Sequence, residues 1–404
     1  MTKRSLVLIA ILAILAFAVS GFAQDTTVTP PSSRVGPPGH VRTPLYVIAH
    51  DGKIGNDAVN YAYETPSSIA CVYGVTQLTP GCPTTGTIVS TGGSKAIAVV
   101  EYGNYSNVQS DLQTFSSQFG LGGNTSIINL CYPSSPCPAN NGTGWDLEEA
   151  LDVQYAHAMA PNAQIIVVSF TNDPLGDGAE QGGAAYIAAN YSAGEMSNSF
   201  TYDGGEEWCA PPDNCELQYD SDFTQPGIVY FASAGDSGLG TAYPSISPNV
   251  VSAGGSQINR TNGNYESESC WSGSGGGLSQ YEPLPQYQLY VANRTNFMRG
   301  SPDRGLDSSG NSPVNIYSSS YCGGWCGVYG TSVASPTLAG ISNFAGNFKS
   351  STMADEAPLY QLYIRPTQYL TVFYSPTTGN NGLPAELGWD QCTGLGTPRK
   401  PAYF

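Results

Sequence analysis

The sequence predicts a single large α/β domain with a mostly parallel sheet and helices on both faces. Apolar runs of strand length alternate with longer segments of helical character between residues 96 and 233. This alternation is typical of parallel sheets whose crossover helices cover both faces. Residues 51–404 are also enough for one ample core, and they show no internal repeat.

Each expected element has a local reason. Strand-like runs are expected at 96–101, 126–130, 164–169, 196–200 and 228–233. The helices that separate them span 108–119, 147–160 and 179–190, and mostly small, apolar residues predict another at 337–348. For the helix at 147–160, Asp146 and Glu149 form a capping-box start and Pro161 closes the segment.

The charge balance limits the partners of the chain. Lys plus Arg number 14 and Asp plus Glu 31, so the net charge is -17. Such a chain repels itself at neutral pH and loses much of this charge in acid. The lack of basic patches makes it a poor candidate for binding nucleic acid.

The N-terminus predicts secretion. Residues 1–23 read as a signal peptide, with Lys3 and Arg4, an apolar core at 6–19 and small residues at the cleavage site. That apolar core is short for a membrane span, so we expect no membrane association after its removal. Residues 24–50 form a short tail, and residues 51–404 form the main domain, which we expect to be monomeric.

Secretion places the ten cysteines in an oxidising compartment. Three pairs read as locally closed loops: Cys71 with Cys82, Cys131 with Cys137, and Cys209 with Cys215. The other four allow three pairings, of which Cys322 with Cys326 and Cys270 with Cys392 is the first choice.

Three segments carry candidate chemistry. Ser332, in Gly330-Thr331-Ser332, stands at the mouth of the predicted final helix, where backbone N–H groups can stabilise an oxyanion. Glu148 and Asp152 are four residues apart and so share one helix face. Asp236 follows the strand at 228–233, where open α/β sheets place their sites. Each has an ordinary structural explanation too: a helix cap, a solvated acidic face and a turn residue.

Histidine is the usual base for a serine nucleophile, and the chain has only three. His40 and His50 lie in a Pro-rich stretch. His157 shares the predicted helix with Glu148 and Asp152, but it lies five residues after Asp152 and so points about 140° away.

The three segments, in this order, resemble the sedolisin family of serine-carboxyl peptidases. Further matches are Tyr243-Pro244, Ala253-Gly254-Gly255-Ser256, Gly273-Ser274-Gly275-Gly276-Gly277 and Gly394-Leu395-Gly396-Thr397-Pro398. The resemblance covers roughly residues 60–404. It implies a subtilisin-like single domain in which Ser332 is the nucleophile, Glu148 the general base, Asp152 its partner and Asp236 the oxyanion stabiliser. Protons shared among clustered carboxyls, and a neutral Asp236 as donor, both favour acid conditions.

The chain departs from this family in two places. The family carries a large N-terminal prodomain, whereas only residues 24–50 lie between the leader and the recognisable start. The family also binds calcium near the C-terminus; here Gly388 and Asp390 match the end of that motif, Glu386 replaces a glycine, and Ser375 stands where an aspartate is expected. Calcium is therefore possible at a degenerate site formed by Asp390, Gly388 and Glu386.

Three functions follow as alternatives. The first is a secreted endopeptidase that acts in acid on polypeptide substrates. The second is a catalytically silent secreted relative that binds peptides or a cell surface. The third is a serine hydrolase that depends on His157.

Overall fold

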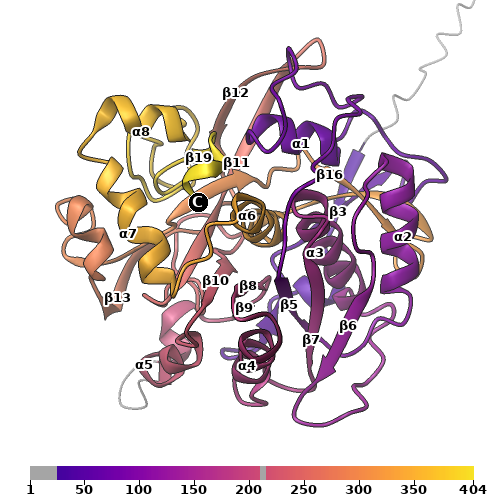
Figure 1. Cartoon of the computed structure of the whole chain (residues 1–404), viewed down its shortest axis with the longest axis horizontal. Coiled ribbons are helices and arrows are strands. Elements are labelled where there is room, and N and C mark those ends of the chain that lie inside the picture. The colour runs from indigo at the N-terminus through magenta and orange to yellow at the C-terminus, as the bar shows by residue number, and fades with distance from the viewer. Residues whose placement is uncertain (1–24, 210–214) are drawn as a thin grey trace, which may run out of the picture.

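The computed structural model describes residues 25–209 and 215–404. The predicted signal peptide at 1–23 lies outside the described residues. Figure 1 shows a central sheet with helix α6 (Thr331–Ala345) beside α3 (Trp145–Met159), and a C-terminal part that carries α7 (Thr352–Leu362) and α8 (Pro366–Val372).

The main sheet has eight strands in the order β12-β11-β10-β8-β5-β7-β6, with β15 also paired to β11. All pairings are parallel except that of β11 with β12. The bounds are β5 Ala96–Tyr102, β6 Ile127–Cys131, β7 Gln164–Phe170, β8 Gly194–Asn198, β10 Ile228–Ser233, β11 Val250–Thr261, β12 Asn264–Cys270 and β15 Arg304–Asp307. The mostly parallel sheet is thus as predicted, although the strand expected at 196–200 begins two residues earlier.

The two faces of this sheet bury separate cores. In β5, Ile97 and Val99 pack in the larger cluster with residues of α3 and α6. Ala98 and Val100 point to the opposite face, into a cluster that includes α4 (Ala179–Tyr191). Successive side chains of a strand alternate between faces, so this run of apolar residues reflects burial on both sides.

A second sheet carries the N-terminal part of the chain. Its order is β1-β3-β17-β16, with β4 paired to β3. The bounds are β1 Asp25–Val28, β3 Tyr46–His50, β4 Lys53–Ile54, β16 Val314–Ser318 and β17 Gly324–Tyr329. The remaining pairs are β2 Val41–Arg42 with β9 Thr201–Tyr202, β13 Gly277–Pro283 with β14 Met298–Ser301, and β18 Phe373–Tyr374 with β19 Thr397–Pro398; the other helices are α1 Pro66–Val72, α2 Val108–Phe119 and α5 Cys215–Tyr219.

Two helix starts differ from the prediction. Helix α6 begins at Thr331, six residues before the expected start, and includes Pro336. Proline has no N–H for the carbonyl of Ser332, and the Ser199 Oγ lies 3.4 Å from that carbonyl oxygen. Helix α3 begins at Trp145 after Gly144, so Asp146 is not its N-cap and the predicted capping box is absent. The Asp146 carboxylate instead accepts the N–H groups of Gly142 and Gly144.

All five expected disulfides are present: Cys71–Cys82, Cys131–Cys137, Cys209–Cys215, Cys270–Cys392 and Cys322–Cys326. The first choice for the last four cysteines is therefore confirmed. Cys270–Cys392 joins β12 to the C-terminal region across 122 residues, so it closes the longest loop of the five.

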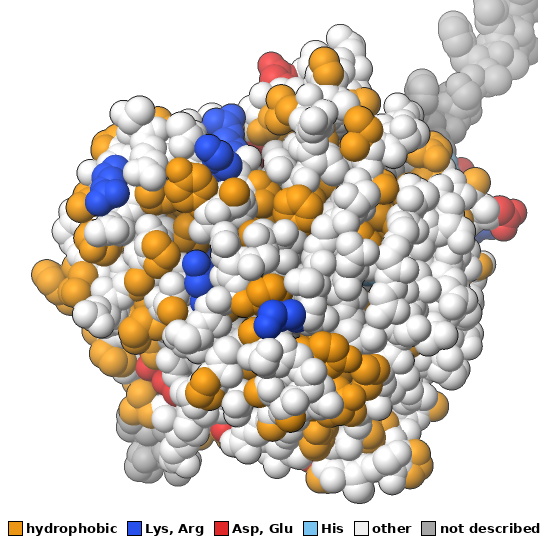
Figure 2. All heavy atoms as spheres, viewed as in Figure 1, with side chains coloured by type: hydrophobic (Ala, Val, Ile, Leu, Met, Phe, Trp, Pro, Cys, Tyr) orange, Lys and Arg blue, Asp and Glu red, His pale blue; other side chains and the backbone are white. Residues whose placement is uncertain are grey.

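The surface carries few charges. On the face shown in Figure 2, the Lys and Arg side chains form isolated spots rather than a continuous basic patch. Among the described residues, no helix is both long and apolar enough to cross a membrane.

Candidate active site

Ser332 lies in the first turn of α6, two residues after a glycine at which a Cβ would clash with its neighbours. Gly330 has φ 137°, and a Cβ on it would lie 2.2 Å from the Pro44 carbonyl oxygen and 2.5 Å from Asp236 Oδ2. Ser332 is fully buried, and its Oγ has no hydrogen-bond partner within hydrogen-bonding distance and angle among the described residues. Ser335, one turn later, is instead engaged with Ser197 (Oγ to Oγ, 2.8 Å). Ser332 therefore has the uncommitted hydroxyl.

Helix α3 places Glu148 and Asp152 beside that hydroxyl. Both carboxyls are fully buried. Burial and the neighbouring Asp152 raise the pKa of Glu148 well above its usual range, and the Ser332 hydroxyl partly opposes this. Burial likewise raises the pKa of Asp152, against a hydrogen bond from the Ser199 hydroxyl (Oγ to Oδ1, 3.0 Å). The structure thus brings together the pair that the sequence placed on one helix face.

Two further buried acids adjoin this pair, and sequence reasoning did not assign them to the site. Glu101, near the end of β5, has its pKa raised well above the usual range by burial and then by Asp152 and Glu148. Burial raises the pKa of Glu149 to about 8, and its Oε2 accepts the Tyr105 N–H and the Asn140 side-chain amide. Glu149 was expected only to cap the helix, and that expectation is wrong. The sequence offered one signal for Glu101, since it is an acidic residue at the end of an apolar run predicted to be a strand.

Asp236 faces the start of α6 from the turn after β10. Its Oδ1 accepts both the N–H and the hydroxyl of Thr331, each at 2.8 Å. Its Oδ2 is buried and has no hydrogen-bond partner among the described residues. Burial raises the pKa of Asp236 to about 7, and the bonds from Thr331 and the charge of Arg42 lower it less strongly. Below that pH Asp236 is neutral and can donate one hydrogen bond.

None of the three histidines makes a hydrogen bond to Ser332, Glu148, Asp152 or Asp236. His157 is nine residues beyond Glu148 in α3, about 13 Å along the helix axis. Burial lowers the pKa of His157 to about 4. His40 lies against Asp203 (Nδ1 to Oδ2, 3.3 Å), and His50 lies against Asp25 (Nδ1 to Oδ1, 2.7 Å).

Two clefts meet at Asp236. One, of about 1020 Å³, is lined by β1, Tyr46, Trp271 and Tyr329. The other, of about 270 Å³, is lined by Val35, Arg42, residues 201–205 and Gly275. Tyr46 lines the larger cleft and Arg42 the smaller one. Between them in sequence, the Pro44 carbonyl accepts the Ser332 N–H (3.3 Å).

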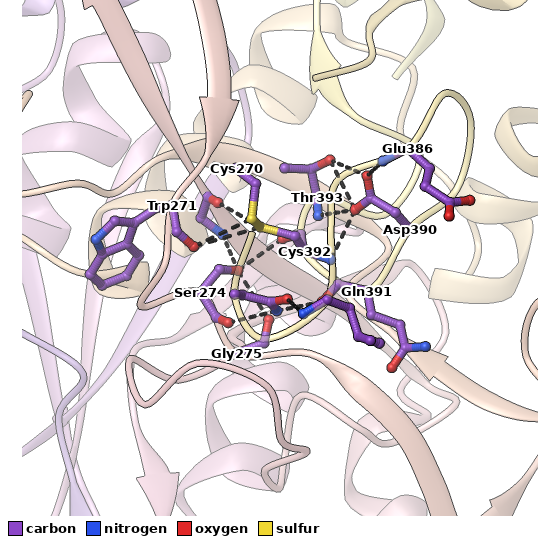
Figure 3. Close-up of a disulfide and its surroundings, with 12 residues drawn as sticks. Cys270, Trp271, Ser274, Gly275, Glu386, Asp390, Gln391, Cys392 and Thr393 are labelled. Carbon is purple, nitrogen blue, oxygen red and sulfur yellow. Dashed lines mark hydrogen bonds between the residues drawn. A yellow bond between two sulfur atoms is a disulfide. The ribbon is translucent and has the colours of Figure 1, made fainter. Parts of the chain in front are cut away.

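The residues expected to hold calcium do not form a cation site. Asp390 Oδ1 accepts the N–H groups of Cys392 (2.9 Å) and Thr393 (2.8 Å), and Oδ2 accepts that of Glu386 (3.0 Å). Figure 3 shows these bonds beside the Cys270–Cys392 disulfide, with the Glu386 carboxylate pointing away from Asp390. Calcium takes six to eight oxygens, but both oxygens of Asp390 already face N–H donors.

A fixed cation is present at the same loop. Arg294 Nη1 donates to Glu386 Oε2 (2.9 Å) and to the Trp389 carbonyl (2.8 Å), and Nη2 donates to the Leu387 carbonyl (3.3 Å). The Ser375 hydroxyl accepts the Gly388 N–H at 3.0 Å. The oxygen atoms of this loop therefore suit a guanidinium rather than calcium. No cluster of three His, Cys, Asp or Glu that could hold a metal occurs in the described ranges.

Comparison with known proteins identifies the family. The profile described as the subtilase family, Peptidase_S8, matches residues 137–389. The chain belongs to this family. The match covers α3, the turn with Asp236 and the start of α6, so it includes all four candidate catalytic residues.

Curated relatives narrow this assignment. The chain is 28% identical over 351 residues to kumamolisin of Bacillus sp. (strain MN-32), covering 76% of this chain and 59% of that protein. It is 26% identical over 346 residues to sedolisin of Pseudomonas sp. (strain 101), covering 76% and 57%. The chain spans about half to three fifths of the length of the relatives it matches. The resemblance to sedolisins is confirmed.

A solved structure supports the fold. Pseudomonas sedolisin, described as a serine-carboxyl proteinase complexed with two molecules of pseudo-iodotyrostatin, superposes with a TM-score of 0.65 at 22% identity. The superposition covers 84% of this chain and 96% of that one. The subtilisin-like fold of this sedolisin-type chain is therefore confirmed.

Proposed function

We propose that this chain is a secreted serine-carboxyl endopeptidase that acts in acid, with Ser332 as nucleophile, Glu148 as base, Asp152 as its partner and Asp236 as oxyanion stabiliser. One observation carries the proposal: an uncommitted serine hydroxyl meets buried carboxyls of raised pKa, and no histidine adjoins it. Its sedolisin-type relatives support polypeptides as substrates.

The chemistry begins with the proton of Ser332. Glu148 takes that proton as Ser332 Oγ attacks the substrate carbonyl, and it later returns the proton to the leaving amine. Because Glu148 and Asp152 share a buried site, they titrate as a pair, and one proton held by Asp152 leaves Glu148 free to act as base. Neutral Asp236 donates from Oδ2 to the oxyanion, where a carboxylate would repel it.

The first test is proteolysis by purified protein and its Ser332→Ala variant. We expect wild type to cleave a denatured protein at about pH 3–5, the range of carboxyl titration, and to lose this activity towards neutral pH. Ser332→Ala should lower kcat/KM by at least about 10³-fold, because it removes the nucleophile. Circular dichroism and thermal unfolding check that the variant is folded. Activity of the folded variant equal to wild type would remove Ser332 from the mechanism, whereas an inactive wild type would favour the peptide-binding relative.

A further inference from the structure

The N-terminal segment of the chain lies over the candidate active site and shows how a polypeptide runs beside Ser332. The Ser332 N–H donates to the Pro44 carbonyl oxygen at 3.3 Å. Two residues later, Tyr46 lies directly opposite Tyr329 in the antiparallel pairing of β3 with β17. Tyr329 ends β17 and lies three residues before Ser332. The end of β17 is therefore a place where an extended peptide continues past the nucleophile by adding a strand.

We infer that Tyr329 is a specificity-determining residue, and that it selects an aromatic side chain on the second residue after the cleaved bond of a polypeptide substrate. This inference rests on the proposed function, because it concerns substrates of the same nucleophile. It goes further by giving the chemical class of a preferred substrate residue and the side chain that recognises it.

The position in the substrate follows from one carbonyl group. A backbone N–H at the nucleophile and a neutral carboxyl are the donors that a developing oxyanion needs. The Pro44 carbonyl oxygen accepts the Ser332 N–H. That oxygen and Asp236 Oδ2 lie 2.2 Å and 2.5 Å from where a Cβ on Gly330 would be, so both face the same small space. A substrate carbonyl in this place puts the second residue after the cleaved bond opposite Tyr329.

Tyr329 presents the face of its ring to this position. The rings of Tyr46 and Tyr329 stack with their centroids 5.1 Å apart and their planes inclined by 23°. Aromatic side chains that lie directly opposite each other on neighbouring strands stabilise the pairing beyond the burial of their area. An aromatic side chain of a substrate gains the same stack, whereas a small side chain does not.

A second ring and three glycines hold Tyr329 in place. Trp271 meets the Tyr329 ring edge to face, with centroids 6.0 Å apart. A Cβ on Gly255 would lie 2.6 Å from the Trp271 indole, and one on Gly273 would lie 2.3 Å from it. A Cβ on Gly310 would lie 3.0 Å from the Tyr329 ring. The rings thus fill the space of three missing side chains, and a surface that is already ordered loses little entropy when it binds a substrate.

The larger cleft leaves room for the side chain of a substrate. Its volume is about 1020 Å³, and Tyr329, Trp271 and Asp236 all line it. Pockets that hold whole small ligands have volumes of about 300–1,000 Å³. A cleft of this size therefore accommodates an aromatic side chain together with its neighbours in the peptide.

Peptides that differ at a single position test the selectivity. They share one sequence around the cleaved bond and carry Phe, Tyr, Leu or Ala as the second residue after it. At about pH 4, in the range of carboxyl titration, we expect kcat/KM to be at least about tenfold higher with Phe or Tyr than with Ala, mostly through KM. Mass spectrometry locates the cut. A control series varies the third residue after the bond and should change kcat/KM by less than about threefold.

Matched tyrosine variants show whether Tyr329 causes the preference. Tyr329→Ser should reduce the ratio of kcat/KM for Phe over Ala to about threefold or less, whereas Tyr329→Phe keeps the ring and should keep the ratio. Tyr317→Ser is the control, because Tyr317 is half-buried on the same hairpin but packs on Trp325 and does not line the cleft. Thermal unfolding checks that each variant is folded. An unchanged ratio in Tyr329→Ser, or an equal loss in Tyr317→Ser, would remove Tyr329 as the selecting residue.

Hydrogen exchange tests the same stack without any activity. In the Ser332→Ala protein Tyr46 is the aromatic side chain on Tyr329, so exchange of the backbone amides at 47–48 reports how firmly it is held. Tyr46→Ala and Tyr329→Ala should each speed this exchange by about threefold to tenfold, and the double variant should be little faster than either. Tyr46→Phe should exchange as the Ser332→Ala protein does. Additive effects in the double variant would overturn the inference.

The outcomes separate this inference from the proposed function. Cleavage of the peptides with equal kcat/KM for Phe and Ala would overturn the inference and leave the proposed function standing. Failure of folded wild type to cleave any of the peptides or a denatured protein would overturn both.

Discussion

At the scale of single residues, burial decides which groups around Ser332 hold protons. Glu148, Asp152 and Glu101 are fully buried, and burial is the largest cause of the raised pKa of each. Removing any one acid changes how protons are shared among the others. Substitutions here should therefore alter the pH profile as well as the rate.

The base is tested by comparing acids with the histidine on the same helix. Glu148→Gln should lower kcat/KM by at least about 100-fold, because the amide cannot take the Ser332 proton. Asp152→Asn should also lower it, whereas His157→Ala should leave it near the wild-type value. The measurement is kcat/KM at acid pH for variants shown to be folded by thermal unfolding. An inactive, folded His157→Ala would instead favour the histidine-dependent hydrolase.

The titration of Asp236 predicts how the activity falls at the high-pH end of the pH profile. Its pKa is raised to about 7, so it is a neutral donor below that pH and a repelling carboxylate above it. Asp236→Asn keeps a donor that does not titrate, so the variant should retain part of the activity and lose less of it as pH rises through 7. A profile of kcat/KM for both proteins decides this. An unchanged upper limb at full activity would show that Asp236 takes no part.

Sequence spacing predicted some of these neighbours and missed others for a physical reason. Glu148 and Asp152 are one helical turn apart, so local geometry alone placed them together. Glu101 and Ser199 reach Asp152 from other parts of the chain, β5 and the residue after β8, through packing that no local period encodes. The segment over the site was missed because its contacts with Asp203 join residues more than 160 positions apart.

At the scale of elements, the C-terminal loop is held by an arginine and a disulfide. Arg294 binds the Glu386 carboxylate and two loop carbonyls, and Cys270–Cys392 fixes the loop to β12. The sequence identified Asp390, Gly388 and Glu386 as a degenerate calcium motif. It could not identify Arg294, which lies almost a hundred residues away and reaches the loop only in the folded chain.

This arrangement predicts different responses to chelation and to reduction. A chelator should leave the melting temperature unchanged, because no ligand is removed. Replacing Cys270 and Cys392 by Ser should destabilise the fold by about 5 kcal/mol, since the bridge closes a loop of 122 residues. Differential scanning calorimetry on the inactive Ser332→Ala background measures both changes. A large loss on chelation that calcium alone restores would show a metal site that this geometry does not offer.

At the scale of the whole molecule, buried acids make stability depend on pH. Burial raises the pKa of Glu149, Glu195 and Glu356 to about 8 in each case, and that of Glu101, Glu180 and Asp307 well above the usual range. Because the folded state binds these protons more tightly than the unfolded state, stability is greatest in acid and falls as pH rises.

We therefore expect the free energy of unfolding to fall as pH rises between about pH 4.5 and 8, and one fully titrating group contributes at most about 1.4 kcal/mol per pH unit. Urea unfolding of the Ser332→Ala protein across this range measures the slope without self-digestion. Glu149→Gln removes one titrating group and should make the slope shallower by up to that amount. A free energy that rises over this range would contradict the raised pKa values.

Because Arg294 binds the C-terminal loop, the positive charge in that loop does not depend on the medium around the protein. A metal ion is shared with the surroundings and leaves when its concentration falls, whereas a guanidinium is covalently part of the chain and stays charged at every pH that proteins meet. The loop between Glu386 and Asp390 thus carries its own cation. That cation stays in place on dilution, in mineral-poor water and in the presence of organic acids that sequester calcium. None of these conditions removes the positive charge from the loop.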